Sequence, residues 1–260
     1  MVDFLGALLL GIVQGVTEWL PVSSSGHLVL FQQFLGLDAG VSFDIMLHLS
    51  TLCVVLLAFR KDLCAVLLAL IRRDFESKEG RMGLFIIIAS IVGGAVALLF
   101  ERYIAFMFRS TLVVGCALFI MGFILLSSKI ERPRSALDGR RAAFIGIAQG
   151  FTVVPGISRS GTTVTASLLS GIEREEAVRF SFLLSIPAIA GASLYALRDA
   201  PSLSMEPLPL AAGMLASFIV GYLALKWLIR LIMKKRFWMF SFYCWALGLL
   251  VIFLSAGASI

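Results

Sequence analysis

The sequence has 260 residues, of which 60% are hydrophobic and only 15% are charged. An ordinary soluble domain has about 25% charged residues. This composition therefore excludes a soluble enzyme, a disordered regulator and a secreted disulfide-rich domain, and it predicts a polytopic membrane protein. The formal net charge of +6 is interpreted as a marker of topology rather than of a nucleic-acid partner, because the cytoplasmic loops of membrane proteins collect Lys and Arg.

The first apolar stretch covers about residues 4–36 and is interrupted in its middle by Pro, Gly and Ser residues. A helical span needs about 20 mostly apolar residues, and the halves of this stretch are mostly shorter. We therefore expect a re-entrant helical hairpin, although Phe4–Leu20 as a complete span stays an open alternative. Trp19 is expected to anchor the chain at the membrane interface. The stretch has no basic n-region, so a cleaved signal peptide is not expected.

Six later segments are uninterrupted and long enough to span a membrane, and a second interrupted stretch, about 142–171, lies between the third and the fourth. The six segments are about 41–59, 83–100, 111–128, 177–197, 208–229 and 238–256. Leu63–Ile71 is short, apolar and flanked by basic residues, which predicts an interfacial helix. The predicted fold class is an all-α integral membrane protein with six transmembrane helices and two re-entrant helical hairpins.

The two interrupted stretches contain related sequences. Residues 11–26 read GIVQGVTEWLPVSSSG and residues 146–161 read GIAQGFTVVPGISRSG, with eight of sixteen positions identical. Three spans follow each copy, so the second copy enters the membrane from the opposite side. The sequence therefore predicts one membrane domain, 1–260, made of two inverted-topology units, 1–141 and 142–260, whose polar tips meet near the midplane.

Four loops hold eighteen of the 22 Lys and Arg residues; they are 60–82, 129–141, 171–179 and 226–237. With these loops on the cytoplasmic side of the cell membrane, both termini lie outside. The small residues Gly93, Gly94 and Gly115 can pack helices within one chain or between two copies. A homodimer therefore remains an open prediction.

Polar residues interrupt the first apolar stretch at residues 14–27. Glu18 is the only acidic residue well within a hydrophobic segment, and an intramembrane ionisable residue marks a functional site by default. Gln14 precedes it by four residues, so the two side chains share one helix face. The structural alternative is that Glu18 snorkels or caps the turn.

The second interrupted stretch carries Arg159 between two serines, in PGISRSGTT at residues 155–163. A buried guanidinium needs an anion, and its planar fork binds a phosphate or a carboxylate through two hydrogen bonds. Backbone N–H groups at a helix start would add a further anion site. The structural alternative is an ion pair between Arg159 and Glu18 that joins the two hairpins.

Glu18, Ser24, His27 and Arg159 together supply the parts of a phosphoryl-transfer site. We expect Ser24 to attack phosphorus while His27 manages its proton and Glu18 orients or charges that network. Arg159 is expected to neutralise the transferring group. His48 follows Asp44 by four residues. It is interpreted either as a wall of this site or as a packed intramembrane histidine.

The motifs QGVTEWLPVSSSGH and PGISRSGTT resemble the two signature motifs of the undecaprenyl-diphosphate phosphatase family, the bacitracin-resistance type of membrane phosphatase. The resemblance extends over the whole chain. It implies hydrolysis of a polyprenyl diphosphate to the monophosphate, which recycles the carrier lipid of cell-wall synthesis, at a site open to the outer face of the membrane.

The candidate site residues form three groups, and the resemblance implies the catalytic group and most of the substrate-binding group. The catalytic group is Glu18, Ser24, His27 and Arg159. The substrate-binding group is Gln14, Ser23, Ser25, Gly26, Gly156, Ser158, Ser160 and Thr163. The supporting group is Thr17, Asp44, His48 and Gln149.

Divalent cations are associated with the activity of this family, so Mg²⁺ or Ca²⁺ is a possible cofactor. The sequence contains no complete ligand set, and Glu18 is the expected contributor. The family pattern allows Glu or Gln where this chain has Gln14, which disfavours a mechanism with two carboxylates. His27 or water remains an alternative nucleophile to Ser24.

Three other functions were weighed. A lipid flippase or transporter fits inverted repeats with polar tips at the midplane, and it remains the alternative, alone or together with hydrolysis. A purely structural membrane subunit would have no need of Glu18 and Arg159. The type 2 phosphatidic acid phosphatases need a histidine after the Ser-Arg pair, and no histidine follows Arg159.

Overall fold

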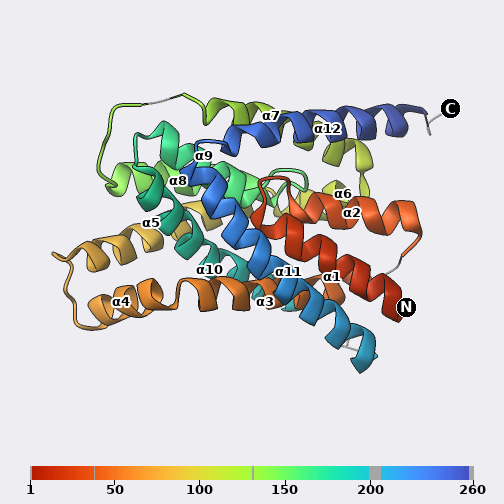
Figure 1. Cartoon of the computed structure of the whole chain (residues 1–260), viewed down its shortest axis with the longest axis horizontal. Helices are drawn as coiled ribbons and strands as arrows, with labels where there is room; N and C mark the ends of the chain where they lie inside the picture. The colour runs from red at the N-terminus through yellow and green to blue at the C-terminus, as the bar shows by residue number, and fades with distance from the viewer. Residues whose placement is uncertain (1, 38, 131, 199–205, 258–260) are drawn as a thin grey trace.

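The computed structural model describes residues 2–37, 39–130, 132–198 and 206–257, and every regular element in these ranges is helical (Figure 1). This confirms the all-α class. Five elements are long and apolar enough to cross a membrane: α3 (Gly40–Ala58), α5 (Lys78–Leu98), α10 (Arg174–Arg198), α11 (Pro207–Met233) and η2 with α12 (Phe237–Met239 and Phe240–Gly257). Helix α6 (Glu101–Arg109) meets α7 (Thr111–Ser127) at 101°, and this bent pair is the sixth candidate span.

Both interrupted stretches form two helical arms separated by a break. The first consists of α1 (Phe4–Trp19) and α2 (Ser24–Leu35), and the second of α8 (Gly139–Gly150), the short η1 (Phe151–Val153) and α9 (Arg159–Leu169). Each break contains a proline and a residue with positive φ, Ser23 at 68° and Gly156 at 106°. Proline lacks the N–H that a continuous helix needs, so both helices stop at their breaks.

The second arm of each hairpin begins with the same cap. Ser23 Oγ accepts a hydrogen bond from the Gly26 N–H at 3.3 Å, and Ser158 Oγ accepts one from the Gly161 N–H at 3.2 Å. A serine at this position satisfies an N–H group that the helix leaves without a partner. The repeat has therefore kept its capping serines for a local structural reason.

The helices of the two halves pack in a reciprocal pattern. The first arm of each hairpin lies against the second span of the other half, α1 on α11 and α8 on α5, while α7 packs on α12 and α3 on α10. The crossings are close: a Cβ added to Gly11 would lie 2.2 Å from the Gly213 carbonyl oxygen, and one added to Gly146 would lie 2.6 Å from that of Ala89. Small residues permit such backbone approach in membrane helices.

Three glycines were predicted to pack helices either within one chain or between two copies, and their surroundings differ. A Cβ on Gly93 would lie 2.9 Å from the Gly146 carbonyl oxygen, and one on Gly115 would lie 3.1 Å from the Ile252 nitrogen. Gly93 and Gly115 therefore pack helices within one chain. Gly94 has nothing within 4 Å of an added Cβ.

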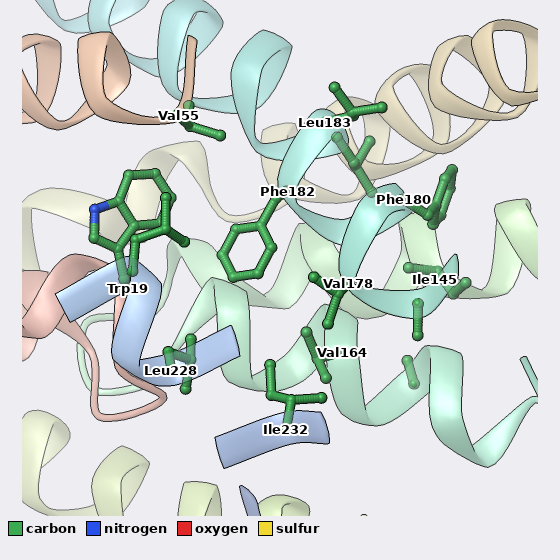
Figure 2. Close-up of a cluster of buried hydrophobic side chains, with 14 of the residues drawn as sticks. Trp19, Val55, Ile145, Val164, Val178, Phe180, Phe182, Leu183, Leu228 and Ile232 are labelled. Carbon is green, nitrogen blue, oxygen red and sulfur yellow. The ribbon is translucent and has the colours of Figure 1, made fainter. Parts of the chain in front are cut away.

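The largest apolar cluster joins the two halves of the chain (Figure 2). It brings together side chains from the first hairpin, the second hairpin and the spans α10 and α11, including Trp19, Val164, Phe182 and Leu228. Trp19 is fully buried, and its ring centroid lies 5.7 Å from that of Phe182. The expectation that Trp19 anchors the chain at the membrane interface was therefore wrong, because the crossing of α1 over the molecule carries this ring into the core.

The two hairpins open toward opposite ends of the molecule, and their turns lie side by side near its centre (Figure 1). The start of α1 and the end of α12 lie at one end, whereas the α4–α5 and α7–α8 connections lie at the other. The predicted Leu63–Ile71 helix is part of α4 (Arg60–Ile71), in which only Val66 and Ala69 are buried among its residues. Its position at the membrane interface stays a prediction.

Candidate active site

Glu18, in the last turn of α1, is the centre of a buried polar cluster. Its side chain is only 3% exposed. Its Oε2 accepts a hydrogen bond from Ser24 Oγ at 2.6 Å and another from Gln14 Nε2 at 3.1 Å. The helical spacing of four residues aligns Gln14 with the carboxylate, as the sequence predicted, and the break that follows α1 folds Ser24 back onto it.

Arg159, the first residue of α9, pairs with the other oxygen of this carboxylate. Its Nη2 donates to Glu18 Oε1, and the two residues are 141 positions apart in the chain. Removing either charge from water is costly, and mutual pairing offsets much of that cost. The predicted ion pair between the hairpins is therefore present. A guanidinium has five N–H donors, and this contact uses one of them.

Two helix starts meet at this ion pair. Ser24 and Arg159 are the first residues of α2 and α9, and the two turns lie together near the centre of the molecule (Figure 1). The N-terminus of a helix carries a partial positive charge and directs backbone N–H groups outward. The arrangement is suited to hold an anion with several negative oxygens, such as a phosphate.

His48 reaches the cluster from α3. Its Nε2 lies 3.6 Å from Glu18 Oε2, and its Nδ1 lies 2.8 Å from the Asp44 carbonyl oxygen. Of the two interpretations of this histidine, the geometry agrees with a wall of the site. Thr51, one turn further along α3, accepts a hydrogen bond from Gln14 Nε2 at 3.4 Å. Sequence reasoning missed Thr51, although its spacing of three residues from His48 put it on the same face.

His27 lies on another side of the break. Its Nδ1 is 2.8 Å from the Ser23 carbonyl oxygen, and its Nε2 is 2.7 Å from the Tyr243 hydroxyl of α12. The rings of His27 and Tyr243 also stack, with centroids 5.8 Å apart. Both ring nitrogens therefore have partners other than Ser24, whose hydroxyl is held by Glu18. Tyr243 was not predicted, because nothing local links it to a residue 216 positions earlier.

The candidate phosphate-binding serines join the two breaks through the backbone. Ser23 Oγ accepts from the Gly156 N–H at 3.0 Å, Ser160 Oγ donates to the Trp19 carbonyl at 2.8 Å, and Ser158 Oγ donates to the Leu20 carbonyl at 3.5 Å. These bonds fix Ser24 and Arg159 relative to each other. Ser25 Oγ lies 3.3 Å from Ser23 Oγ, at the edge of this network.

Two predicted glycines fill the contact between the breaks and α7. A Cβ on Gly26 would lie 3.1 Å from Gly156 Cα, and a Cβ on Gly156 would lie 2.6 Å from Ala117 Cβ. Gly156 also has a φ of 106°, which side chains rarely tolerate. Close packing and backbone conformation therefore require glycine at position 156, whereas a Cβ at Gly26 would make a tight contact that needs a small shift of its neighbour.

The remaining predicted residues make their hydrogen bonds away from the ion pair. Thr163 and Thr17 donate to carbonyl oxygens of their own helices, at Arg159 and Val13 respectively. Asp44 accepts two hydrogen bonds from Gln32 Nε2, each 3.0 Å long. Gln149 faces α5, where its Nε2 lies 3.3 Å from a Cβ added to Gly93.

Comparison with known proteins agrees with this geometry. The family model described as bacitracin resistance protein BacA matches residues 7–250. The chain belongs to the BacA family. It is similar to proteins named undecaprenyl-diphosphatase from Korarchaeum cryptofilum, Methanobrevibacter smithii and Rubrobacter xylanophilus. The identities are 40%, 41% and 41%, covering 95%, 96% and 96% of this chain and 97%, 96% and 98% of the relatives. Membership confirms the resemblance that the two motifs indicated.

The divalent cation expected from the BacA family resemblance finds a poor set of donors. Within the described ranges, no group of three or more His, Cys, Asp and Glu side chains could hold a metal ion. Both oxygens of Glu18 already accept hydrogen bonds, from Arg159 and from Ser24. Hard cations prefer several oxygen ligands. These residues therefore do not form a site in which protein ligands could hold a divalent cation.

Proposed function

We propose that this protein hydrolyses undecaprenyl diphosphate to undecaprenyl phosphate and inorganic phosphate, and so recycles the carrier lipid of cell-wall synthesis. The proposal rests on one observation above all: Ser24 Oγ donates to Glu18 Oε2 at 2.6 Å beside the buried Arg159. A nucleophile, a base and a fixed cation are thus collected at two helix starts. Membership of the BacA family and the printed names of its relatives support the same reaction.

In the proposed mechanism Ser24 is the nucleophile and Glu18 its base. Ser24 Oγ bonds to the terminal phosphorus while the bond from that phosphorus to the bridging oxygen breaks, and undecaprenyl phosphate leaves. The Ser24 proton passes to Glu18 Oε2 across the existing hydrogen bond. Water then gives its hydroxyl group to phosphorus and a proton to Ser24 Oγ, which releases inorganic phosphate.

Arg159 stabilises the charge of the transferring phosphoryl group. Its side chain is 17% exposed, compared with 3% for Glu18, so the guanidinium lies between the carboxylate and the more open part of the site. A fixed cation needs no reorganisation as charge develops on the phosphate oxygens. The partial positive charges of the α2 and α9 starts act in the same direction.

The proposed membrane arrangement has six spans and two re-entrant hairpins in an inverted-topology repeat. The opposite openings of the hairpins and their adjoining turns support it (Figure 1). The basic loops indicate that the end with the α4–α5 and α7–α8 connections is cytoplasmic. Both termini are then outside, and the first hairpin admits the diphosphate from the outer face.

The prenyl chain of the substrate has a candidate site beside the second hairpin. An apolar cavity of about 710 Å³ lies between α7, α8 and α9. Its lining includes Ile157 and Thr162, which precede and follow Arg159 in the sequence, and Cys116 and Ala166 further along the cavity. The cavity would give the prenyl chain an apolar, close-packed surface on the hairpin that carries Arg159.

Release of phosphate by the purified protein tests the proposed function. In detergent with undecaprenyl diphosphate, wild-type protein should release phosphate, and Ser24→Ala should reduce kcat by at least about 10³-fold. Ser135→Ala, in the connection between α7 and α8 away from both breaks, is the control and should retain most activity. Lipid movement in vesicles without any phosphate release would overturn the enzyme assignment and favour a transporter.

A further inference from the structure

The orientation of His48 is fixed by its own helix. Nδ1 lies 2.8 Å from the Asp44 carbonyl oxygen, which can only accept a hydrogen bond, so Nδ1 carries a proton. Nε2 is then the nitrogen that gains or loses a proton, and it is the one that faces Glu18 Oε2 at 3.6 Å. His48 therefore presents Nε2 to the Glu18 carboxylate at a distance slightly longer than a hydrogen bond.

The chain has only two histidines. The other one, His27, has hydrogen-bond partners at both ring nitrogens. The Nδ1 of His27 donates to the Ser23 carbonyl oxygen, and its Nε2 is hydrogen-bonded to Tyr243. Its side chain holds the start of α2 against α12. Between the two, only His48 has a titrating nitrogen directed at Glu18.

The charges around His48 come from few elements. Glu18 of α1 faces its Nε2, Arg159 of α9 neutralises the far oxygen of that carboxylate, and Asp44 lies one turn earlier on α3. The spans α10 and α11 also pack against α3. They carry no charged residue between Arg179 and Arg198, or between Glu206 and Lys226.

The reaction makes a proton that a buried carboxylate cannot keep. Near neutral pH, a diphosphate ester of charge −3 and one water yield a monophosphate ester of charge −2, HPO₄²⁻ and one H⁺. Water returns a proton to Ser24, so the net proton is the one that Ser24 first gave to Glu18. While Glu18 holds it, the carboxyl group is neutral beside Arg159 and cannot serve as base for the next cycle.

We propose that His48 takes this proton from Glu18 and passes it to the solvent, so that His48 rather than His27 is the proton-transfer histidine of the site. The inference rests on the proposed phosphatase function. His48 is a positioning residue for Glu18, since it acts through that carboxylate and not on the phosphate. Its side chain is 27% exposed against 3% for Glu18, and α3 begins at the end of the molecule where α2 ends (Figure 1).

The pH dependence of His48→Gln tests this role. The glutamine amide can still donate to Glu18 but cannot carry the proton. Neutral His48 is the form that accepts a proton, so wild-type kcat should show an acidic limb, in which activity falls as the pH is lowered. In His48→Gln this limb should disappear and kcat should fall about 10–100-fold with little change in KM. The substrate phosphate also titrates near pH 6, so both proteins are compared on the same substrate, farnesyl diphosphate.

The outcomes separate this inference from the proposed function. A His48→Gln profile that follows the wild-type profile, with similar kcat, overturns the role of His48 and leaves the phosphatase intact. No phosphate release by wild type on farnesyl or undecaprenyl diphosphate overturns the phosphatase itself. His48→Asn is the second variant where His48→Gln folds poorly, and it should lose the same limb.

A spectroscopic measurement can detect the contact between His48 and Glu18 in the absence of substrate. Protein labelled with ¹⁵N-histidine should give two sets of imidazole signals, assigned with His48→Gln and His27→Gln. Glu18→Gln should change the chemical shifts of the His48 signals, while the His27 signals should stay as they are. A His48 signal that is indifferent to Glu18→Gln would contradict the proposal.

Discussion

The two hairpins share a sequence pattern and a cap, but their second arms are held very differently. Helix α9 has nine of its eleven residues buried, whereas α2 has five of twelve. The end of α2 leaves Phe34 and Leu35 more than half exposed. The second hairpin is thus a packed platform that presents Arg159, and the first is a more accessible arm that presents Ser24. The two copies therefore differ in how firmly the second arm of each hairpin is packed.

The repeat also separates structural from chemical positions. Positions identical in both copies, such as Gly11 with Gly146 and Ser23 with Ser158, make helix crossings and caps. The residues proposed for chemistry stand where the copies differ: Ser24 corresponds to Arg159, His27 to Thr162 and Glu18 to Val153. An ancestral hairpin pair would have supplied the fold, and divergence at the tips its chemistry.

The largest expected effect comes from breaking the contact between the hairpins. Arg159→Ala leaves the Glu18 carboxylate buried without its partner, which should lower the free energy of unfolding by about 3–5 kcal/mol and abolish phosphate release. Glu18→Gln combined with Arg159→Met should recover much of the stability but none of the activity. Thermal unfolding in detergent measures both. Wild-type stability for Arg159→Ala would mean that the pair does not join the hairpins.

A methyl group at a helix crossing should have the next largest effect. Gly11→Ala would drive a Cβ to 2.2 Å from the Gly213 carbonyl oxygen, and such overpacking costs about 1–3 kcal/mol. Gly94→Ala is the control, since nothing lies within 4 Å of its Cβ, and it should be neutral or slightly stabilising. Equal unfolding temperatures for the two variants would contradict the reciprocal packing of the halves.

Removal of the N-cap serine from each hairpin should lower the free energy of unfolding by different amounts. Ser158→Ala should cost about 1 kcal/mol, as for an ordinary N-cap. Ser23→Ala should cost more, because Ser23 Oγ accepts from the Gly156 N–H across the breaks at 3.0 Å, whereas the contact of Ser158 Oγ with the Leu20 carbonyl is a longer 3.5 Å. Chemical unfolding monitored by tryptophan fluorescence compares them. A larger loss for Ser158→Ala would show that the hydrogen bond across the breaks contributes little.

The smallest effect concerns the prenyl chain. Cys116 is exposed and lines the cavity beside α9, so Cys116→Trp should raise KM a few-fold for undecaprenyl diphosphate and much less for farnesyl diphosphate. Cys53→Trp, at another exposed cysteine, should change neither. Steady-state kinetics gives the KM of each variant for both substrates. Equal effects on long and short substrates would remove the prenyl chain from this cavity.

Much of the fold and the centre of the site were predictable from the sequence. Uninterrupted apolar runs located the candidate spans, and the repeat located both breaks. The Gln14–Glu18 spacing and the lone arginine in the second break predicted the cluster that Glu18, Arg159 and Ser24 form. These features depend on helical period and on the cost of burying charge, both of which are local properties of the sequence.

The rest depended on long-range packing. Trp19 was misassigned because only the crossing of α1 over the core buries it. The partner of His27, Tyr243, comes from the last helix, and no pattern near either residue indicates the pairing. The position of His48 against Glu18 arises from the packing of α1 on α3, so its two interpretations could not be separated by sequence alone.

The central claim is that the two breaks assemble a phosphoryl-transfer site with Ser24 as nucleophile. The most direct test is acid quenching of wild-type protein during turnover of farnesyl diphosphate labelled in its terminal phosphate, followed by mass spectrometry of the peptide that contains Ser24. An acid-stable phosphate is expected on Ser24, retained in Ser135→Ala and absent in Ser24→Ala. An acid-labile phosphate on His27, or near-normal turnover by Ser24→Ala without any label, would contradict it.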